Sequence, residues 1–168
     1  MPLAHGTFFL CTVYPNDTLY SIGMRFGSTI EQIDQLNVLY PPFTDPGLVF
    51  PGQILVVPYR YNPTTQVFYS IRPGDSMYLI ANQFSTSVEN LNRLNPQIKN
   101  PNWIYPNFPL KIPVRIYIVS PSDSLYNIAN RSRISIEALI RANRGRPGFS
   151  PDVLFPGYGL VIPDSRQA

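Results

Sequence analysis

Carboxylates recur in register along this chain of 168 residues, and paired carboxylates are the groups that most glycosidases use to cleave glycosidic bonds. The pairs are Asp17 with Glu31, Asp75 with Glu89, and Asp123 with Glu137. All six positions also stand where a helix is expected to begin, and negative charge is favourable there without any catalytic role. Because this structural explanation is sufficient, we do not predict an enzyme and assign no catalytic residue.

This sequence has few of the residues that nucleophilic catalysis or metal binding would use. Cys11 is the only cysteine, which excludes an intramolecular disulfide. It occupies the position that Tyr69 and Tyr117 hold in two similar stretches, so we interpret it as a buried strand residue and not as a nucleophile. His5 is the only histidine, so a metal site is not expected. No metal or other cofactor is predicted.

The aspartates begin a motif that occurs three times, as DTLYSI, DSMYLI and DSLYNI. An asparagine follows each aspartate by 20 residues, at Asn37, Asn95 and Asn143. Two prolines seven residues apart close each copy, at 51 and 58, at 106 and 113, and at 156 and 163. Only the segment between the asparagine and the first of these prolines varies in length. A constant frame with one variable loop indicates a tandem structural repeat.

The repeat divides the chain into three units. Copy one is placed at 1–60 with its core at 8–58, a linker at 61–65, copy two at 66–114, copy three at 115–163, and a short tail at 164–168. Units of this size are near the lower limit for independent folding. Some packing between neighbouring copies is therefore expected.

Each copy is predicted to fold in the order strand, helix, helix, strand. The first strands are the apolar stretches Phe9–Val13, Phe68–Ile71 and Ile116–Val119. The aspartates are expected to cap the first helix. The pattern S/T-x-x-E is expected to start the second helix at Ser28 and Thr86, with Ser135 as the cap in copy three. The spaced asparagines suit a left-handed position at the end of the second helix.

The last strand of each copy follows a predicted type II turn, centred on Pro51-Gly52, Pro106-Asn107 and Pro156-Gly157. The two strands are expected to pair antiparallel, with both helices on one face. The predicted fold class is therefore α+β, with three tandem small βααβ modules, each with a two-stranded antiparallel sheet. The extra residues of copy one, Val38–Gly47, are expected to form an ordered loop without a strand.

These copies resemble LysM modules, whose pattern runs from an aromatic-x-Val strand through Gly-Asp-Thr-Leu and a central Leu-Asn to Pro-Gly-Gln. Copy one has CTVYPNDTLYSI, QLN and LVFPGQILVVP; copy two has YSIRPGDSMYLI, LNRLNP and NWIYPN; copy three has YIVSPSDSLYNI, RAN and VLFPGYGLVIP. The resemblance is to the bacterial type without disulfides, and it covers nearly the whole chain. It implies a βααβ fold and binding of glycans that contain N-acetylglucosamine, such as peptidoglycan, chitin and their oligomers.

By the same resemblance, sugar is expected in a shallow groove between the loop after the first strand and the loop before the last strand. The first loop contributes Asn16, Asp17, Thr18 and Leu19, then Gly74, Asp75, Ser76 and Met77, then Ser122, Asp123, Ser124 and Leu125. The second loop contributes Leu48, Val49 and Phe50, then Asn102, Trp103 and Ile104, then Asp152, Val153 and Leu154.

Physical reasoning supports sites of this kind. An N-acetyl sugar presents an apolar C–H face, a methyl group and an amide, so apolar side chains and backbone polar groups in adjacent loops would suit it. Phe50, Trp103 and Phe155 are apolar candidates in these loops. Copy two keeps the family's glycine, Gly74, before its aspartate and holds the only tryptophan, so we expect the strongest single site there.

The other copies depart from the family pattern. Asn16 and Ser122 replace the glycine, and asparagine tolerates a positive φ better than serine does. Ser132 stands where copies one and two have Phe26 and Phe84. Copy three is therefore expected to depart most from the family in its core and its site.

These observations predict a non-catalytic bacterial wall-binding protein with three weak sites that act with avidity. The expected partner is peptidoglycan or a chitin-like glycan, with other wall or spore proteins as further partners. The expected location is the cell wall, the spore surface or the secreted fraction. No signal peptide is visible, and no stretch approaches the roughly 18 apolar residues of a membrane span.

Two alternative functions remain open at this point. One is a structural scaffold in a spore coat or wall layer, where glycan binding would serve only to place the protein. The other is nucleic-acid binding, since the formal net charge is +3 and copy three contains RSR and RANRGR. The arginines are sparse and scattered, so nucleic acid is not an expected partner; a steep salt dependence of DNA affinity would indicate otherwise.

Overall fold

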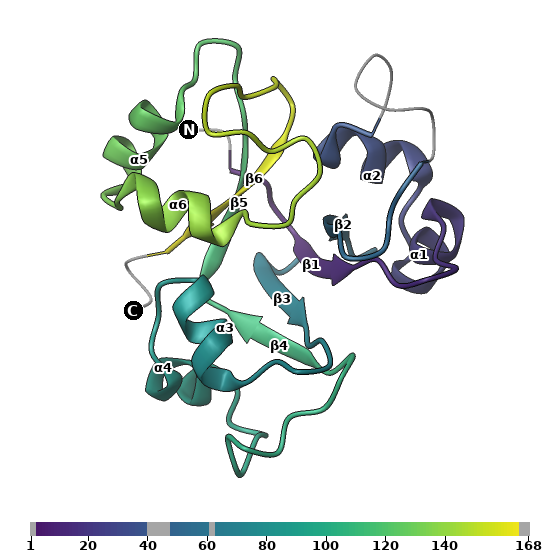
Figure 1. Ribbon diagram of the computed structural model, residues 1–168, viewed down its shortest axis with the longest axis vertical. Coiled ribbons are helices and arrows are strands. Elements are labelled where there is room, and N and C mark those ends of the chain that lie inside the picture. The colour runs from purple at the N-terminus through teal and green to yellow at the C-terminus, as the bar shows by residue number, and fades with distance from the viewer. Residues whose placement is uncertain (1–2, 40–47, 61–62, 165–168) are drawn as a thin grey trace.

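The computed structural model describes residues 3–39, 48–60 and 63–164. Within these ranges the predicted order of strand, helix, helix and strand occurs three times (Figure 1). The elements are β1 (Thr7–Thr12), α1 (Leu19–Phe26), α2 (Ile30–Asn37) and β2 (Ile54–Pro58); β3 (Gln66–Ser70), α3 (Met77–Gln83), α4 (Val88–Leu94) and β4 (Pro109–Ile112); β5 (Val114–Ile118), α5 (Leu125–Ser132), α6 (Ile136–Ala142) and β6 (Gly159–Pro163). Most of the loop predicted in copy one, at 40–47, lies outside the described residues. No helix in the described ranges is long and apolar enough to cross a membrane.

The first helix of each copy is capped by a hydroxyl and not by the aspartate, so that prediction is wrong. The N-caps are Thr18, Ser76 and Ser124, each with an extended backbone. Their side-chain oxygens accept hydrogen bonds from the backbone N–H groups of Ser21, Leu79 and Asn127 at 3.0, 3.1 and 3.1 Å. The aspartate lies one residue too early to reach these groups, and its carboxylate serves the preceding turn.

The second helices begin at Thr29, Ser87 and Ser135, which are their N-caps. Ser135 is as predicted, whereas the starts predicted at Ser28 and Thr86 are wrong by one residue. Two adjacent hydroxyl residues compete for the cap in copies one and two, and the first of each pair has another partner. Ser28 donates to the carbonyl of Pro58, and the Thr86 hydroxyl accepts from the Asn90 side chain at 2.9 Å.

The spaced asparagines are buried and do not adopt the predicted left-handed conformation. Asn95 has φ −128°, Asn143 has φ −104°, and in copy one Val38, the residue after Asn37, is left-handed instead. Each side-chain amide joins the second helix to the last strand of its copy. Asn95 donates to the carbonyls of Leu91 at 2.8 Å and Lys111 at 2.9 Å, and accepts from the Lys111 N–H at 2.8 Å. Asn37 and Asn143 make the same three bonds.

Within each copy the two strands pair antiparallel, as predicted. The three sheets are not all separate, however, because β1 also pairs with β3 in parallel, from Thr7 opposite Gln66 to Leu10 opposite Tyr69. Copies one and two therefore share a four-stranded sheet of order β2-β1-β3-β4, while β5 and β6 form a sheet of their own. The physical reason is that a two-stranded sheet leaves unpaired edges and is only marginally stable alone.

The shared sheet places the helices of copies one and two on opposite faces (Figure 1). The central strands β1 and β3 are parallel, and each has its own partner, β2 or β4, on its outer side. A rotation of 180° about an axis parallel to these strands therefore relates copy one to copy two, and it turns the helices to the other face of the sheet. The side chains follow this relation. Cys11 and Leu55 belong to the cluster of α1 and α2, whereas Leu10 of the same strand packs in the cluster that contains Tyr69 and Phe84 of copy two.

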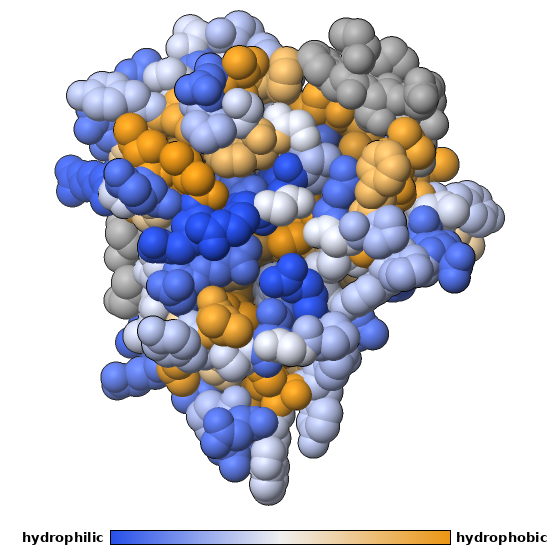
Figure 2. Space-filling model, in the orientation of Figure 1, coloured by the Kyte–Doolittle hydropathy of each residue, from blue (hydrophilic) through white to orange (hydrophobic). Residues whose placement is uncertain are grey.

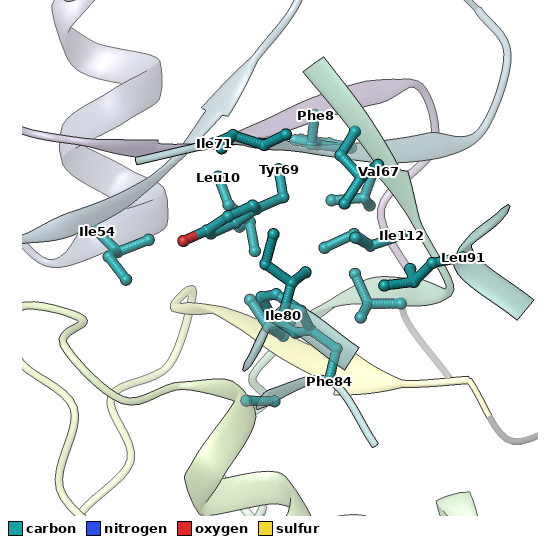
Figure 3. Close-up of a cluster of buried hydrophobic side chains, with 14 of the residues drawn as sticks. Phe8, Leu10, Ile54, Val67, Tyr69, Ile71, Ile80, Phe84, Leu91 and Ile112 are labelled. Carbon is teal, nitrogen blue, oxygen red and sulfur yellow. The ribbon is translucent and has the colours of Figure 1, made fainter. Parts of the chain in front are cut away.

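One hydrophobic core draws on all three copies. Figure 3 labels residues that copies one and two contribute to it. It holds Phe8 and Leu10 of β1 with Tyr69 of β3, and it extends to Ile116 and Val161 on the sheet of copy three. Each of copies one and three keeps a second cluster against its own helices. Copy two has its helices against the shared core itself, so the copies cannot be separated without exposing apolar surface.

Copy three is also joined to copy one by a buried arginine. Arg146 donates from Nη2 to Asn37 Oδ1 at 2.9 Å and from Nη1 to the Gly159 carbonyl at 2.6 Å. Its guanidinium lies over the Tyr158 ring, 4.6 Å from the ring centre. Packing at this contact is tight, since a Cβ on Gly159 would lie 3.1 Å from Leu36 Cδ2.

Candidate functional site

The two loops predicted to form each groove are held side by side by backbone hydrogen bonds. In copy one, Val13 at the end of the first loop's strand donates to the Gln53 carbonyl at 2.8 Å and accepts from the Gly52 N–H at 2.8 Å. Ile71 and Val119 make the equivalent pairs of bonds in copies two and three. The predicted type II turns support this arrangement: Gly52, Asn107 and Gly157 have φ of 95°, 68° and 88°. The structure thus brings together the two loops in every copy.

The aspartate that recurs in each copy fixes the first loop from within. In copy two, Asp75 Oδ2 accepts hydrogen bonds from the Arg72 N–H at 2.8 Å and from the Tyr69 hydroxyl at 2.7 Å. In copy three, Asp123 accepts from the Tyr117 hydroxyl at 2.6 Å and from Arg131 Nη2 at 2.7 Å. Burial alone would raise the pKa of Asp123, but these hydrogen bonds outweigh it and lower that pKa below the ordinary value.

Copy one builds the same turn without the tyrosine. Asp17 accepts from the Tyr14 N–H at 2.9 Å and from Arg25 Nη2 at 3.0 Å. Cys11 takes the tyrosine's place and is 1% exposed, which confirms it as a buried strand residue. Burial raises the pKa of its thiol to about 11, against the smaller lowering effect of Arg25. The thiol is therefore neutral near pH 7, the opposite of what a nucleophilic cysteine needs.

The two carboxylates of each predicted pair lie in different surroundings. The aspartates are held within their turns, while Glu31, Glu89 and Glu137 are exposed in the first turns of the second helices. Within the described residues, no group of three or more histidine, cysteine or acidic side chains is arranged to hold a metal ion. The chemistry that these loops offer is hydrogen bonding and apolar contact.

Large apolar side chains are exposed in the second loops. Trp103 is 67% exposed and Tyr105 is 65% exposed, while Phe50 in copy one is 54% exposed. At this exposure Trp103 does not pack inward beneath its loop. The neighbouring predicted residues Val49, Ile104 and Leu154 are half-buried and pack on the cores of their copies. Each second loop thus has an inner apolar residue that anchors it and exposed ones beside it.

The remaining predicted residues divide into exposed and buried groups. The side chains of Leu19, Met77 and Leu125 are buried at 2%, 3% and 5% exposure, so they belong to the core. The loop residues that are exposed are Asn16, Thr18, Leu48, Gly74, Ser76, Asn102, Ser122, Ser124, Asp152 and Val153.

Sequence reasoning missed Tyr105 and compared Trp103 with the wrong residues. Counted back from the turn prolines at 51, 106 and 156, Trp103 is equivalent to Leu48 and Val153, not to Phe50. Tyr105 is the residue equivalent to Phe50. The constant spacing of these turns was the signal that could have found it.

The first loops differ in backbone conformation as their residues allow. Asn16 and Gly74 have positive φ, 73° and 88°, whereas Ser122 does not adopt such a conformation. Copy three also buries Ser132 at 7% exposure, and its hydroxyl has no hydrogen-bond partner within the described part of the chain. The expectation that copy three departs most from copies one and two agrees with both observations.

Comparison with known proteins places these copies in a described family. The model of the LysM domain matches residues 11–58, 69–113 and 117–163. An N-acetylmuramoyl-L-alanine amidase, sle1, of Staphylococcus aureus strain USA300 is 31% identical over 112 residues, which are 60% of this chain and 31% of that protein. A putative sporulation-specific glycosylase, YdhD, of Bacillus subtilis strain 168 is 32% identical over 105 residues, 62% of this chain and 22% of that protein.

Solved structures are similar over part of the chain. The spore cortex-lytic enzyme SleL of Bacillus cereus aligns with a TM-score of 0.45 at 27% identity, over 63% of this chain and 22% of that one. The ectodomain of a receptor-like kinase aligns over 97% of this chain and 93% of that one, with a TM-score of 0.34 at 20% identity. The chain spans less than a third of the curated relatives described above.

Proposed function

This chain belongs to the LysM domain family, and from that premise we propose that it is a non-catalytic protein that binds glycans containing N-acetylglucosamine. Peptidoglycan, chitin and their oligomers are the proposed ligands, and the three grooves between the paired loops are the proposed sites. The cell wall, the spore surface or the secreted fraction is the proposed location. The names of the relatives, a muramoyl-alanine amidase and a sporulation-specific glycosylase, support a wall or spore setting.

The observation that carries the proposal is the exposed aromatic pair of copy two beside a loop of polar groups. Trp103 and Tyr105 are both about two-thirds exposed, although large aromatic side chains gain by burial. Gly74 and Ser76 on the facing loop leave backbone and hydroxyl groups exposed. Aromatic faces for the C–H surface of a sugar and polar groups for its amide are the combination that an N-acetyl sugar requires.

A rigid arrangement of three weak sites is expected to bind polymers better than oligomers. Each groove is expected to be shallow, as the family resemblance implies, so one module is expected to bind weakly. Because copies one and two share a sheet and all three copies share a core, their grooves are expected to keep a fixed spacing, unlike independent modules on flexible linkers. The gain from a second site then depends on whether one polymer can reach two grooves at that spacing.

Pull-down with insoluble peptidoglycan and with chitin tests this function. We expect retention on at least one polymer at moderate salt, and release by soluble N-acetylglucosamine oligomers. Release of reducing ends from either polymer would show catalysis and contradict the non-catalytic part of the proposal. Failure to bind either polymer would favour the alternative of a structural scaffold in a spore coat or wall layer.

A further inference from the structure

A cleft lies between α6, α3 and the start of β2, and its lining holds more arginines than acidic residues. Its volume is about 270 Å³, and it is lined by all three copies, with Ile54 of copy one, Arg72 and Asp75 of copy two, and Arg141 and Arg144 of copy three. Figure 2 shows strongly hydrophilic side chains on two sides of a hollow at this place, with an apolar patch between them.

Among the described residues, two of the three guanidinium groups have no carboxylate partner. Arg72 Nη2 lies 3.5 Å from Asp75 Oδ1, so these two charges offset each other. Arg141 Nη2 donates to the neutral hydroxyl of Ser85 at 2.9 Å. Within the ranges that the structure describes, the guanidinium of Arg144 forms neither an ion pair nor a hydrogen bond. The positive charges of Arg141 and Arg144 are therefore unbalanced.

The walls of this cleft are held in place by contacts between copies. The Ile54 N–H donates to the Gly145 carbonyl at 3.0 Å, and a Cβ on Gly145 would lie 3.3 Å from Ile54 Cδ1. The bond from Arg141 to Ser85 fixes α6 against the end of α3. The guanidinium of Arg141 is thus held in place before a ligand binds, which reduces the freedom that it loses on binding.

The position of the cleft indicates where its ligand comes from. Guanidinium groups match carboxylates and phosphates in shape and charge. The cleft shares Asp75 with the first loop of the candidate groove in copy two. The cleft and the groove therefore adjoin each other at Asp75, and a substituent that leaves the groove on this side meets Arg141 and Arg144. In peptidoglycan such substituents are peptides that end in carboxylates.

We propose that this three-copy cleft is an anion site that binds a carboxylate of a peptide-substituted glycan held in the groove of copy two. The proposal rests on the proposed function and narrows its substrate class. The protein then prefers glycans that carry peptides over bare polymers of N-acetylglucosamine. None of the copies has this site alone, because its walls come from all three.

Calorimetric titration of the full chain with three soluble probes tests the site. The probes are peptide-bearing peptidoglycan fragments, the same fragments after enzymatic removal of the peptides, and an N-acetylglucosamine oligomer. We expect the peptide-bearing fragments to bind about tenfold more tightly than the stripped ones, in line with charge-assisted hydrogen bonds. This preference shrinks as salt is raised, because the cleft is open to solvent.

Substitutions at the arginines assign the preference to the cleft. The double variant Arg141→Gln/Arg144→Gln is expected to lose the preference and keep its affinity for the oligomer. Arg144→Gln alone, which leaves the bond to Ser85 in place, is expected to lose part of it. Arg133→Gln, at an exposed arginine outside the cleft, is the matched control and keeps the preference.

Three outcomes would overturn the anion site while leaving oligomer binding intact. They are equal affinity of the wild type for peptide-bearing and stripped fragments, a preference that survives in the double variant, and a preference that Arg133→Gln removes as fully as the double variant does. Absence of binding to all three probes would instead contradict the proposed function, and this inference with it.

Discussion

Arg146 of copy three donates a hydrogen bond to Asn37 of copy one, with 2.9 Å between Nη2 and Oδ1. The same Oδ1 accepts from the Val56 N–H at 2.9 Å, so one amide ends α2, holds β2 and binds copy three. Burial lowers the pKa of Arg146, yet the guanidinium keeps hydrogen bonds to both copies. Two residues that are 109 positions apart in sequence thus join copy one to copy three.

Arg146→Ala is expected to destabilise the whole chain and not copy three alone. It leaves the carbonyls of Leu36 and Gly159 without their donor in a buried place, which costs about 2–4 kcal/mol. Denaturant unfolding followed by circular dichroism, which reports on the helices and strands of all copies, measures this. Arg133→Ala, at an exposed position, is the control. A loss confined to one copy, seen as two separate transitions, would contradict the coupling.

Asn95→Ala is expected to cost about 2–4 kcal/mol, because it removes three hydrogen bonds and leaves both backbone groups of Lys111 unpaired. Asn95→Asp tests the donor role separately, since a carboxylate can accept from the Lys111 N–H but cannot donate to its carbonyl. Chemical denaturation compares the variants with Asn102→Ala, at an exposed loop residue. A cost for Asn95→Ala no larger than for the control would show that this amide does not hold α4 to β4.

Ser132→Ala is expected to stabilise the protein by about 1 kcal/mol. The buried hydroxyl of Ser132 has no partner within the described residues, and a buried polar group without a hydrogen bond is unfavourable. Ser124→Ala, which removes the N-cap of α5 in the same copy, is expected to have the opposite sign and a similar size. Thermal unfolding of both variants measures these effects, and a lower melting temperature for Ser132→Ala than for the wild type would contradict the prediction.

The stability of the chain is expected to fall as pH rises above about 9, partly through Cys11. Burial raises the pKa of the folded thiol from 9.0 to about 11, so the unfolded chain releases this proton first. The contribution is fully present below pH 9 and is lost by about 1.4 kcal/mol per pH unit between these values. Unfolding of wild type and Cys11→Ala at pH 7, 9 and 10 separates this effect from that of the buried tyrosines. Parallel pH profiles of the two proteins would argue against it.

Trp103 emission is expected to be that of an exposed indole in the free protein and to shift when N-acetylglucosamine oligomers bind. Trp103→Ala is expected to weaken oligomer binding about tenfold or more, as loss of an aromatic contact does in other recognition sites. The matched controls are Leu48→Ala and Val153→Ala at the equivalent positions, with smaller expected losses. Tyr105→Ala and Phe50→Ala, also at equivalent positions, give a second comparison, in which Tyr105→Ala is expected to weaken oligomer binding more. An unchanged affinity for Trp103→Ala while the polymer is still retained would move the site away from this loop.

Local structure could be predicted from the sequence wherever the residues of a short motif themselves fix the backbone conformation. The Pro-Gly and Pro-Asn turns were predicted, since few residues other than glycine and asparagine accept the φ that follows the proline. The predicted helix caps Asp17 and Ser28 were each wrong by one residue. Two neighbouring residues can both cap a helix, and which of them does so depends on the other hydrogen bonds that each one makes. The asparagine role was missed, since its partners at Val56, Lys111 and Val161 lie across the variable loop.

The sequence by itself determined the three βααβ units, their order and their family, because each depends on spacings that recur within about fifty residues. Only the tertiary structure decided that β1 pairs with β3, that Trp103 and Tyr105 are exposed, and that Arg72, Arg141 and Arg144 line one cleft. The physical reason is that the unpaired backbone groups at the edges of these small sheets can find hydrogen-bond partners in several ways. Which way is chosen depends on apolar faces and buried polar groups from all three copies at once.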